Sequence, residues 1–93
     1  MEEAKGSFIW DQRKERVNTQ KHGISFSMAA QVFKDPKRVI LIDSKHSQKE
    51  QRYFCIGKVR NRIMTVRFIY RDGIIRIYGA GYWRKGREYY EEA

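Results

Sequence analysis

The chain has 93 residues, of which 41% are hydrophobic and 14% aromatic, and its formal net charge is +9. This length predicts one domain over residues 1–93, and the composition excludes a disordered chain. The charge favours a nucleic acid or an acidic protein as partner, and no apolar stretch approaches the roughly 18 residues of a membrane-spanning helix. The N-terminal residues lack the apolar segment of a signal peptide, and the lone Cys55 cannot form an internal disulfide. The sequence therefore predicts a cytoplasmic protein without membrane contact.

Capping signals predict two helices in the first third of the chain. Residues 12–22 lack Gly and Pro, and Val17 is the only aliphatic residue among them, so this helix is expected to be mostly solvated. Asp11 is a favourable N-cap, and Gly23 favours a helix end. Ser25 begins a second helix, whose apolar stripe comprises Met28, Ala29, Val32 and Phe33. The short run Phe8-Ile-Trp10 before the first helix predicts an edge strand or a packing hook.

The remaining residues predict four mainly antiparallel strands and a last helix. The strands are expected at residues 39–42, 52–59, 63–71 and 74–80, and the helix at residues 82–92. Gly86 weakens this helix by about 1 kcal/mol relative to Ala. The predicted fold class is α+β, with helices on one face of the sheet and the other face available.

Two turn signals fix which side chains share a face. A two-residue turn at Asp72-Gly73 pairs Arg71 with Ile74. The register then predicts an apolar face with the pairs Tyr70–Ile75, Phe68–Ile77 and Val66–Gly79. On the opposite face it predicts Arg67 beside Tyr78, Ile69 beside Arg76, and Thr65 beside Ala80. A second two-residue turn, at Arg60-Asn61, would bring Tyr53 and Cys55 to the core face.

The opposite face is the first candidate site, because cations beside an aromatic ring suit RNA. Its central residues are Arg67, Arg76 and Tyr78, and further cations near it are Lys58, Arg62, Arg84 and Lys85. Guanidinium groups bind phosphate and stabilise charge that develops on it. The alternative is a solvated face whose arginines only maintain solubility.

Other candidates each have a structural alternative. Trp83 can stack on a base or anchor the last helix. His46 and Glu50 can act as acid or base, or lie in an exposed loop. His22 is better explained as a favourable cation at a helix C-terminus. No metal or other cofactor is expected, because the acidic residues are scattered and match no ligand signature.

Several sequence blocks together resemble the BrnT toxins. The blocks include Phe8-Ile-Trp-Asp11, Asn18-Thr-Gln-Lys-His-Gly23, Val32-Phe33-x-Asp-Pro36, His46-Ser47 with Glu50-x-Arg52, Gly57, Arg62 and Ile75-Arg-Ile77. The resemblance implies a RelE/ParE-type fold and a ribonuclease toxin of a type II toxin–antitoxin pair. Such a toxin stops translation without a required metal. The implied partner is a BrnA-like ribbon-helix-helix antitoxin, which makes the DNA contacts of the complex. One departure is Gly81, where many relatives carry an arginine, so that Arg84 or Lys85 would supply its charge.

The leading hypothesis is therefore a metal-independent endoribonuclease. In this hypothesis Arg76, with Arg62 or Arg84, stabilises the phosphorane, and Glu50, His46 and Tyr78 are candidates for acid and base. Arg67, Lys58, Trp83 and Lys85 are the expected RNA-binding residues. Two alternatives remain, a non-catalytic nucleic-acid-binding module and an interaction subunit whose basic face holds an acidic partner.

Overall fold

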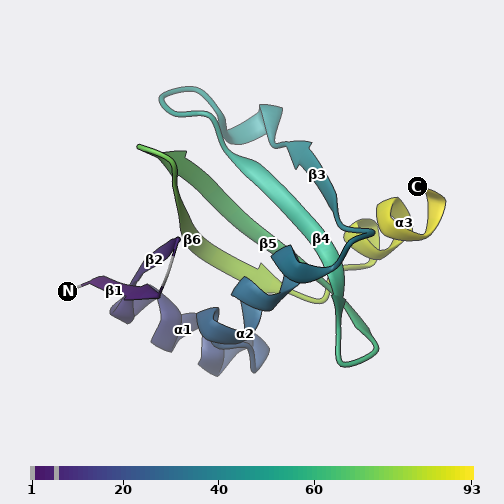
Figure 1. The fold of residues 1–93 in the computed structure, drawn as a ribbon, viewed down its shortest axis with the longest axis horizontal. Coiled ribbons are helices and arrows are strands. Elements are labelled where there is room, and N and C mark those ends of the chain that lie inside the picture. The colour runs from purple at the N-terminus through teal and green to yellow at the C-terminus, as the bar shows by residue number, and fades with distance from the viewer. Residues whose placement is uncertain (1, 6) are drawn as a thin grey trace.

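The computed structural model describes residues 2–5 and 7–93 and shows an α+β fold (Figure 1). The strands are β1 (Glu2–Lys5), β2 (Phe8–Asp11), β3 (Val39–Ile42), β4 (Tyr53–Val59), β5 (Arg62–Arg71) and β6 (Ile74–Gly81). The helices are α1 (Gln12–His22), α2 (Phe26–Ala30) and α3 (Arg84–Glu92), with short 3-10 turns η1 (Gln31–Lys34) and η2 (Ser44–His46). The strands form one sheet in the order β1-β2-β6-β5-β4-β3.

The four predicted strands are present, but the sheet is mixed and contains more strands than expected. β2 is not an edge strand, because it pairs with β1 on one side and runs parallel to β6 on the other. The backbone N–H of Ile75 donates to the carbonyl of Ser7 at 3.0 Å. Trp10 lies opposite Ile77, and both side chains are buried. The apolar run thus adds a parallel strand, an arrangement that requires contact between distant parts of the chain and has no local turn signal.

The helix ends follow the capping signals. The Asp11 carboxylate accepts hydrogen bonds from the backbone N–H groups of Arg13 and Lys14 at 2.8 and 3.2 Å. Gly23 ends α1 with a φ of +69°, in the left-handed region that glycine tolerates best. Ser25 Oγ accepts from the Met28 N–H at 3.1 Å and begins α2. These predictions are confirmed.

The core lies between one face of the sheet and the segment formed by α2 and η1. Phe26 and Val32 from this segment pack with Phe68 and Ile77 from the sheet, and all four are fully or almost fully buried. Arg60 and Asn61 form a two-residue turn with φ values of 51° and 65°, so Tyr53 and Cys55 face this core as the short turn predicted. Burial raises the pKa of the Cys55 thiol to about 12, which makes it an inert core residue.

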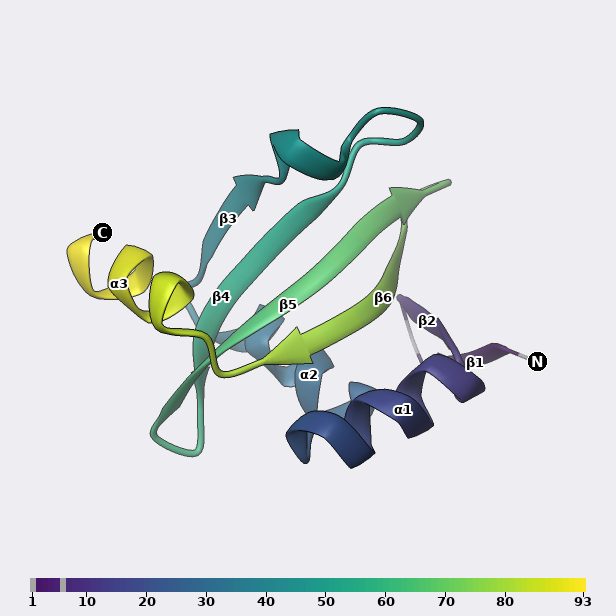
Figure 2. The same ribbon diagram turned by 180° about the vertical axis from the view of Figure 1, so that it is seen from behind.

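The last helix covers the opposite face of the sheet, so the prediction of helices on one face only is wrong. Figures 1 and 2 show α2 and α3 on opposite sides of the strands. Gly86 explains how α3 approaches so closely, because a Cβ atom there would lie 3.2 Å from Thr65 Cβ and would overlap Thr65 Oγ1. Gly86 therefore lowers the helix propensity of α3, but it is required for the packing of this helix on the sheet.

The β5–β6 register agrees with the prediction only up to Ile77. Arg71 lies opposite Ile74, and the pairs Tyr70–Ile75, Ile69–Arg76 and Phe68–Ile77 follow as expected. A β-bulge then shifts the register, so Arg67 lies opposite Gly79, Val66 opposite Ala80, and Thr65 opposite Gly81. The predicted pairs Arg67–Tyr78, Val66–Gly79 and Thr65–Ala80 are therefore wrong, because Tyr78 is the extra residue of the bulge.

Candidate active site

Tyr78 is the centre of a cationic cluster on the face that α3 only partly covers. The guanidinium carbon of Arg52 lies 5.1 Å from the centroid of the Tyr78 ring, and that of Arg67 lies 5.7 Å from it. Partial burial raises the pKa of Tyr78, although both arginines oppose the shift. The phenol therefore stays protonated at neutral pH and can donate a proton or a hydrogen bond.

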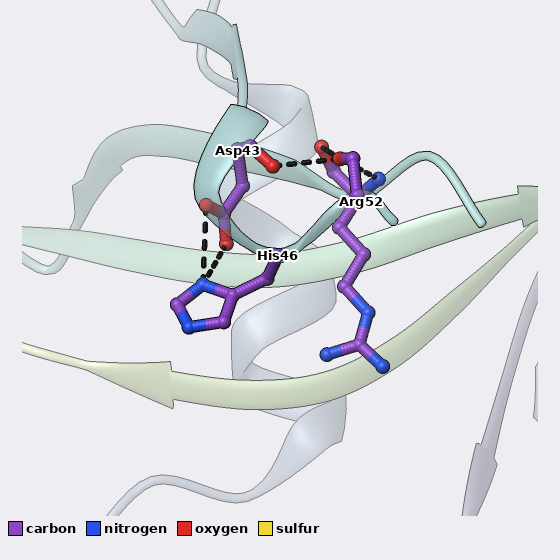
Figure 3. Close-up of polar contacts among 4 residues, drawn as sticks. Asp43, His46 and Arg52 are labelled. Carbon is purple, nitrogen blue, oxygen red and sulfur yellow. Dashed lines mark hydrogen bonds and ion pairs between the residues drawn. The ribbon is translucent and has the colours of Figure 1, made fainter. Parts of the chain in front are cut away.

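Asp43 and His46 form an oriented pair above the same sheet. His46 Nδ1 lies 3.0 Å from Asp43 Oδ2 and 3.2 Å from Oδ1 (Figure 3). Asp43 is 6% exposed, whereas the His46 side chain is 54% exposed. Because a carboxylate can only accept, Nδ1 carries the hydrogen and Nε2 remains as the basic nitrogen. A buried acid thus orients an accessible imidazole for proton transfer.

A small hydrogen-bond network fixes the loop that carries this pair. The Asp43 N–H donates to the Arg52 carbonyl at 2.8 Å, which closes the loop at its base. Ser47 Oγ donates to the Asp43 carbonyl at 2.6 Å and accepts from the Arg52 N–H at 2.9 Å. In Figure 3 the imidazole of His46 and the guanidinium of Arg52 extend in the same direction across the sheet. The loop therefore brings a proton-transfer group and a cation to one side of the molecule.

Arg67 carries a partly buried charge without a counter-ion. Its guanidinium carbon lies 5.3 Å from the Trp83 ring, so the side chain is held between Tyr78 and Trp83. It crosses Gly79 so closely that a Cβ atom there would lie 2.9 Å from Nε, and this nitrogen is buried without a hydrogen-bond partner. Neither of the two ion pairs in the described part of the chain involves Arg67. A partly desolvated, unneutralised guanidinium is a favourable site for an anion.

The predicted grouping of Arg67, Arg76 and Tyr78 on one face holds despite the bulge. Arg76 lies opposite Ile69, which is separated from Arg67 by one residue and therefore faces the same side of β5. Tyr78 contacts Arg67 directly. Arg76 is partly buried. The bulge thus moves the backbone partners by one residue while the three side chains remain on a common surface.

Other predicted site residues lie elsewhere. Arg62 stacks on Tyr82 at 3.6 Å and shares a separate hollow with Lys58 and Arg84. Along β5 it is about 23 Å from the position opposite Arg76, at roughly 3.3 Å per residue. Arg76 therefore does not lie in one site with Arg62 or Arg84. Lys85 lies 6.0 Å from the Tyr89 ring on α3.

Glu50 and Trp83 have structural partners. Glu50 forms an exposed ion pair with Arg71 at 3.2 Å. Trp83 lies against Gly81, where a Cβ atom would be 2.7 Å from the indole, and contacts the His22 ring at a centroid distance of 5.5 Å. These contacts agree with the anchoring interpretation of Trp83. The cation that lies over this indole is Arg67, 5.3 Å from its ring.

Asp43 and Arg52 are the site residues that the sequence interpretation did not assign. Arg52 belongs to the Glu50-x-Arg52 block, and Asp43 lies between the strands predicted at residues 39–42 and 52–59. Their positions in the sequence could have identified them as neighbours. Asp43 directly follows β3 and Arg52 directly precedes β4, and these two strands are paired and antiparallel. Residues that flank a hairpin loop in this way meet at its base. The buried Asp43 therefore lies next to Arg52 and beneath His46.

No cluster of three His, Cys, Asp or Glu residues suited to hold a metal ion occurs among the residues that the structure describes. None of the described helices is long and apolar enough to cross a membrane. Residues 10–86 match the sequence profile of the family described as "Ribonuclease toxin, BrnT, of type II toxin-antitoxin system". The chain belongs to this family. BrnT membership implies an RNA substrate and a cognate antitoxin as partner. No curated protein matches the chain.

Proposed function

We propose that this BrnT chain is a metal-independent endoribonuclease whose active site is the surface formed by His46, Arg52, Arg67, Arg76 and Tyr78. The observation that carries this proposal is the Asp43–His46 pair beside the guanidinium-rich surface around Tyr78. One group there can move a proton, and its neighbours can stabilise negative charge. Both are required for cleavage of RNA through its own 2′-hydroxyl.

In the proposed reaction His46 Nε2 accepts the proton of the ribose 2′-hydroxyl. The 2′-oxygen attacks the adjacent phosphorus, the bond from phosphorus to the 5′-oxygen breaks, and that oxygen gains a proton from the Tyr78 phenol. The products are a 2′,3′-cyclic phosphate and a free 5′-hydroxyl. Arg52 and Arg67 stabilise the pentacoordinate phosphorane, and Arg76 extends the positive potential along β6. The raised pKa of Tyr78 supports its role as proton donor rather than base.

The proposal extends to the cellular partners. RNA cleavage in the cytoplasm would stop translation, and a ribbon-helix-helix antitoxin would silence the toxin by covering the Arg67–Tyr78 surface. The net charge of +9 supports an acidic segment of the antitoxin as the inhibitor. DNA would be bound through the antitoxin in the complex.

The experiment is RNA cleavage by the purified protein in EDTA, with end-group analysis of the products. We expect cleavage that persists in chelator and yields cyclic phosphate ends. His46→Gln should lower the rate by about 10²–10⁴-fold, the usual contribution of a proton-transfer group. Lys45→Ala is the matched control, since Lys45 is exposed on the same short turn.

Three results would contradict the proposal in different ways. Loss of cleavage in EDTA would indicate a metal-dependent enzyme. Full activity of the His46→Gln variant would exclude His46 as the base. RNA binding without cleavage, and without growth arrest on induction, would favour the non-catalytic binding module.

A further inference from the structure

A basic groove lies between α1 and the face of the sheet that carries Tyr78. Its cationic and aromatic lining comprises Arg13, Lys14, Lys21 and His22 from α1, with Arg67 and Tyr78 from the sheet. None of the described residues that line it is acidic. The cavity volume is about 410 Å³, within the range of clefts that hold small ligands. The groove is thus large enough for part of a nucleotide chain.

The orientation of α1 places its cations in this groove. Residues 14, 17, 18 and 21 follow one another at helical spacing and share one side of the helix. Glu15, the acidic residue in the first turn, points to α2 instead, where its carboxylate accepts from the Phe26 N–H at 2.8 Å. Asn18 is the only buried residue of α1. Because α1 buries so little apolar surface, we attribute its place in the fold to the cations that its polar side presents to the groove.

Arg67 and Tyr78 belong both to the groove and to the proposed active site. A strand whose reactive phosphate lies at Tyr78 therefore continues past Arg67 along the cationic side of α1. Lys14 and Lys21 are exposed, and neither takes part in the ion pairs of the described residues. Their ammonium groups are available for phosphates of the same strand.

We propose that this groove binds the phosphates of the single-stranded RNA that flanks the scissile bond, mainly through Lys14 and Lys21. The inference rests on the proposed ribonuclease function and adds a substrate-binding track beyond the catalytic residues. It implies that the protein distinguishes long from short single strands, because a short oligonucleotide occupies the active site without reaching α1.

The test measures binding of 2′-O-methyl oligonucleotides, which lack the attacking hydroxyl, by fluorescence anisotropy at several salt concentrations. The Lys14→Gln/Lys21→Gln variant should bind a nonamer about tenfold more weakly than the wild type. The slope of log affinity against log salt should fall by about 1.4, at about 0.7 per phosphate contact for single strands. The loss should be smaller for a trimer. Arg16→Gln/Lys37→Gln is the matched control, because both residues are exposed and lie outside the groove.

The possible outcomes distinguish a failure of the groove proposal from a failure of the ribonuclease proposal. Equal slopes for the groove variant and the control variant would overturn the groove proposal, even if the wild type cleaves RNA. Absence of cleavage by the wild type would overturn the ribonuclease proposal, while the anisotropy comparison would still report on the groove. Thermal unfolding is measured for each variant and for the single substitutions Lys14→Gln and Lys21→Gln. An unfolding temperature equal to that of the wild type excludes misfolding as the cause of weak binding.

Discussion

Asn18 of α1 is hydrogen-bonded to Ala80 of β6, and this contact attaches a largely polar helix to the sheet. Asn18 Oδ1 accepts from the Ala80 N–H at 3.1 Å, and Nδ2 donates to the Ile24 carbonyl at 3.1 Å. The side chain is buried, so without the amide the Ala80 N–H would lose its partner and the Ile24 carbonyl would keep only the Thr19 hydroxyl, at 3.3 Å. This amide is therefore one of the contacts that position α1 and the basic groove, beside the hydrogen bond between Glu15 and the Phe26 N–H.

Replacement of Asn18 by Ala should lower the free energy of unfolding by about 1–3 kcal/mol, because the buried Ala80 N–H loses its hydrogen bond and the Ile24 carbonyl loses one of its two donors. Denaturant unfolding measures this change. Gln20→Ala, an exposed position on the same helix, should stay within about 0.5 kcal/mol of the wild type. Similar values for the two variants would mean that other contacts hold α1 in place.

Substitution of Gly86 by Ala should destabilise the protein by about 1–3 kcal/mol, because the new methyl group overlaps Thr65 beneath α3. Helix propensity alone predicts the opposite sign, a gain of about 1 kcal/mol. Adding Thr65→Ala should recover part of the loss, since it removes the overlapping hydroxyl. Thermal unfolding of the two single variants and the double variant measures the coupling between the two positions. A Gly86→Ala protein that is more stable than the wild type would disprove the close approach of α3 to Thr65.

Gly81→Ala should displace the indole of Trp83, because a Cβ atom at residue 81 would lie 2.7 Å from the ring. The stability cost should be small, about 1 kcal/mol, since the indole can turn outward. In a Trp10→Phe background the remaining Trp83 emission should shift to longer wavelength. An unchanged emission maximum would show that the ring does not depend on a glycine here. Arg67 would also lose one aromatic neighbour, so RNA affinity should fall in the same variant.

The hydrogen bond between Tyr90 and Asp35 should give α3 a pH-dependent attachment. The Tyr90 hydroxyl donates to Asp35 Oδ2 at 2.6 Å. Partial burial raises the pKa of Asp35, but hydrogen bonds from Tyr90 and from the backbone of Lys58 and Lys37 outweigh it and hold the pKa below 3.8. Hydrogen bonding to Asp35, with burial, raises the pKa of Tyr90 to about 12. Tyr90→Phe should cost about 1 kcal/mol at neutral pH, because the pair is partly exposed.

The difference between the wild type and Tyr90→Phe should change at both ends of the pH range. The Asp35 contribution is present above 3.8 and is lost as the pH falls through the lowered pKa. The Tyr90 contribution is present below about 10 and is lost as the pH rises toward 12. Urea unfolding at pH 3, 7 and 11 tests this dependence, with Tyr89→Phe as control. A difference that stays constant across this range would exclude the proposed attachment.

Local chemistry explains which parts of the fold were predictable from the sequence. Asp11, Gly23 and Ser25 define helix ends through neighbouring backbone groups, and the Arg60-Asn61 and Asp72-Gly73 turns define two hairpins. The bulge at Tyr78 interrupts the strict alternation that the predicted register assumes, since Ile77 and Ala80, three residues apart, both lie in the core. The parallel β2–β6 pair joins distant segments, which no turn specifies.

The only part of the candidate site that was predictable from the sequence is the part on the β5–β6 hairpin. The register placed Arg67, Arg76 and Tyr78 on one face, because they belong to neighbouring strands. The combination of Arg62 with Arg76 came from sequence blocks that carry no distances, and the length of β5 separates the two residues. The role of Asp43 required knowledge of its burial beneath His46.

The parallel pairing of residues 8–10 with residues 75–77 also constrains when the fold can form during synthesis. β2 finds its parallel neighbour only after about four fifths of the sequence has been synthesised, and Tyr78 and Ala80 follow immediately. Contacts of such sequence separation form late, because a long loop must close first. A nascent chain that lacks these residues has neither the phenol of the proposed active site nor the backbone partner of Asn18, so both are in place only when synthesis is nearly complete.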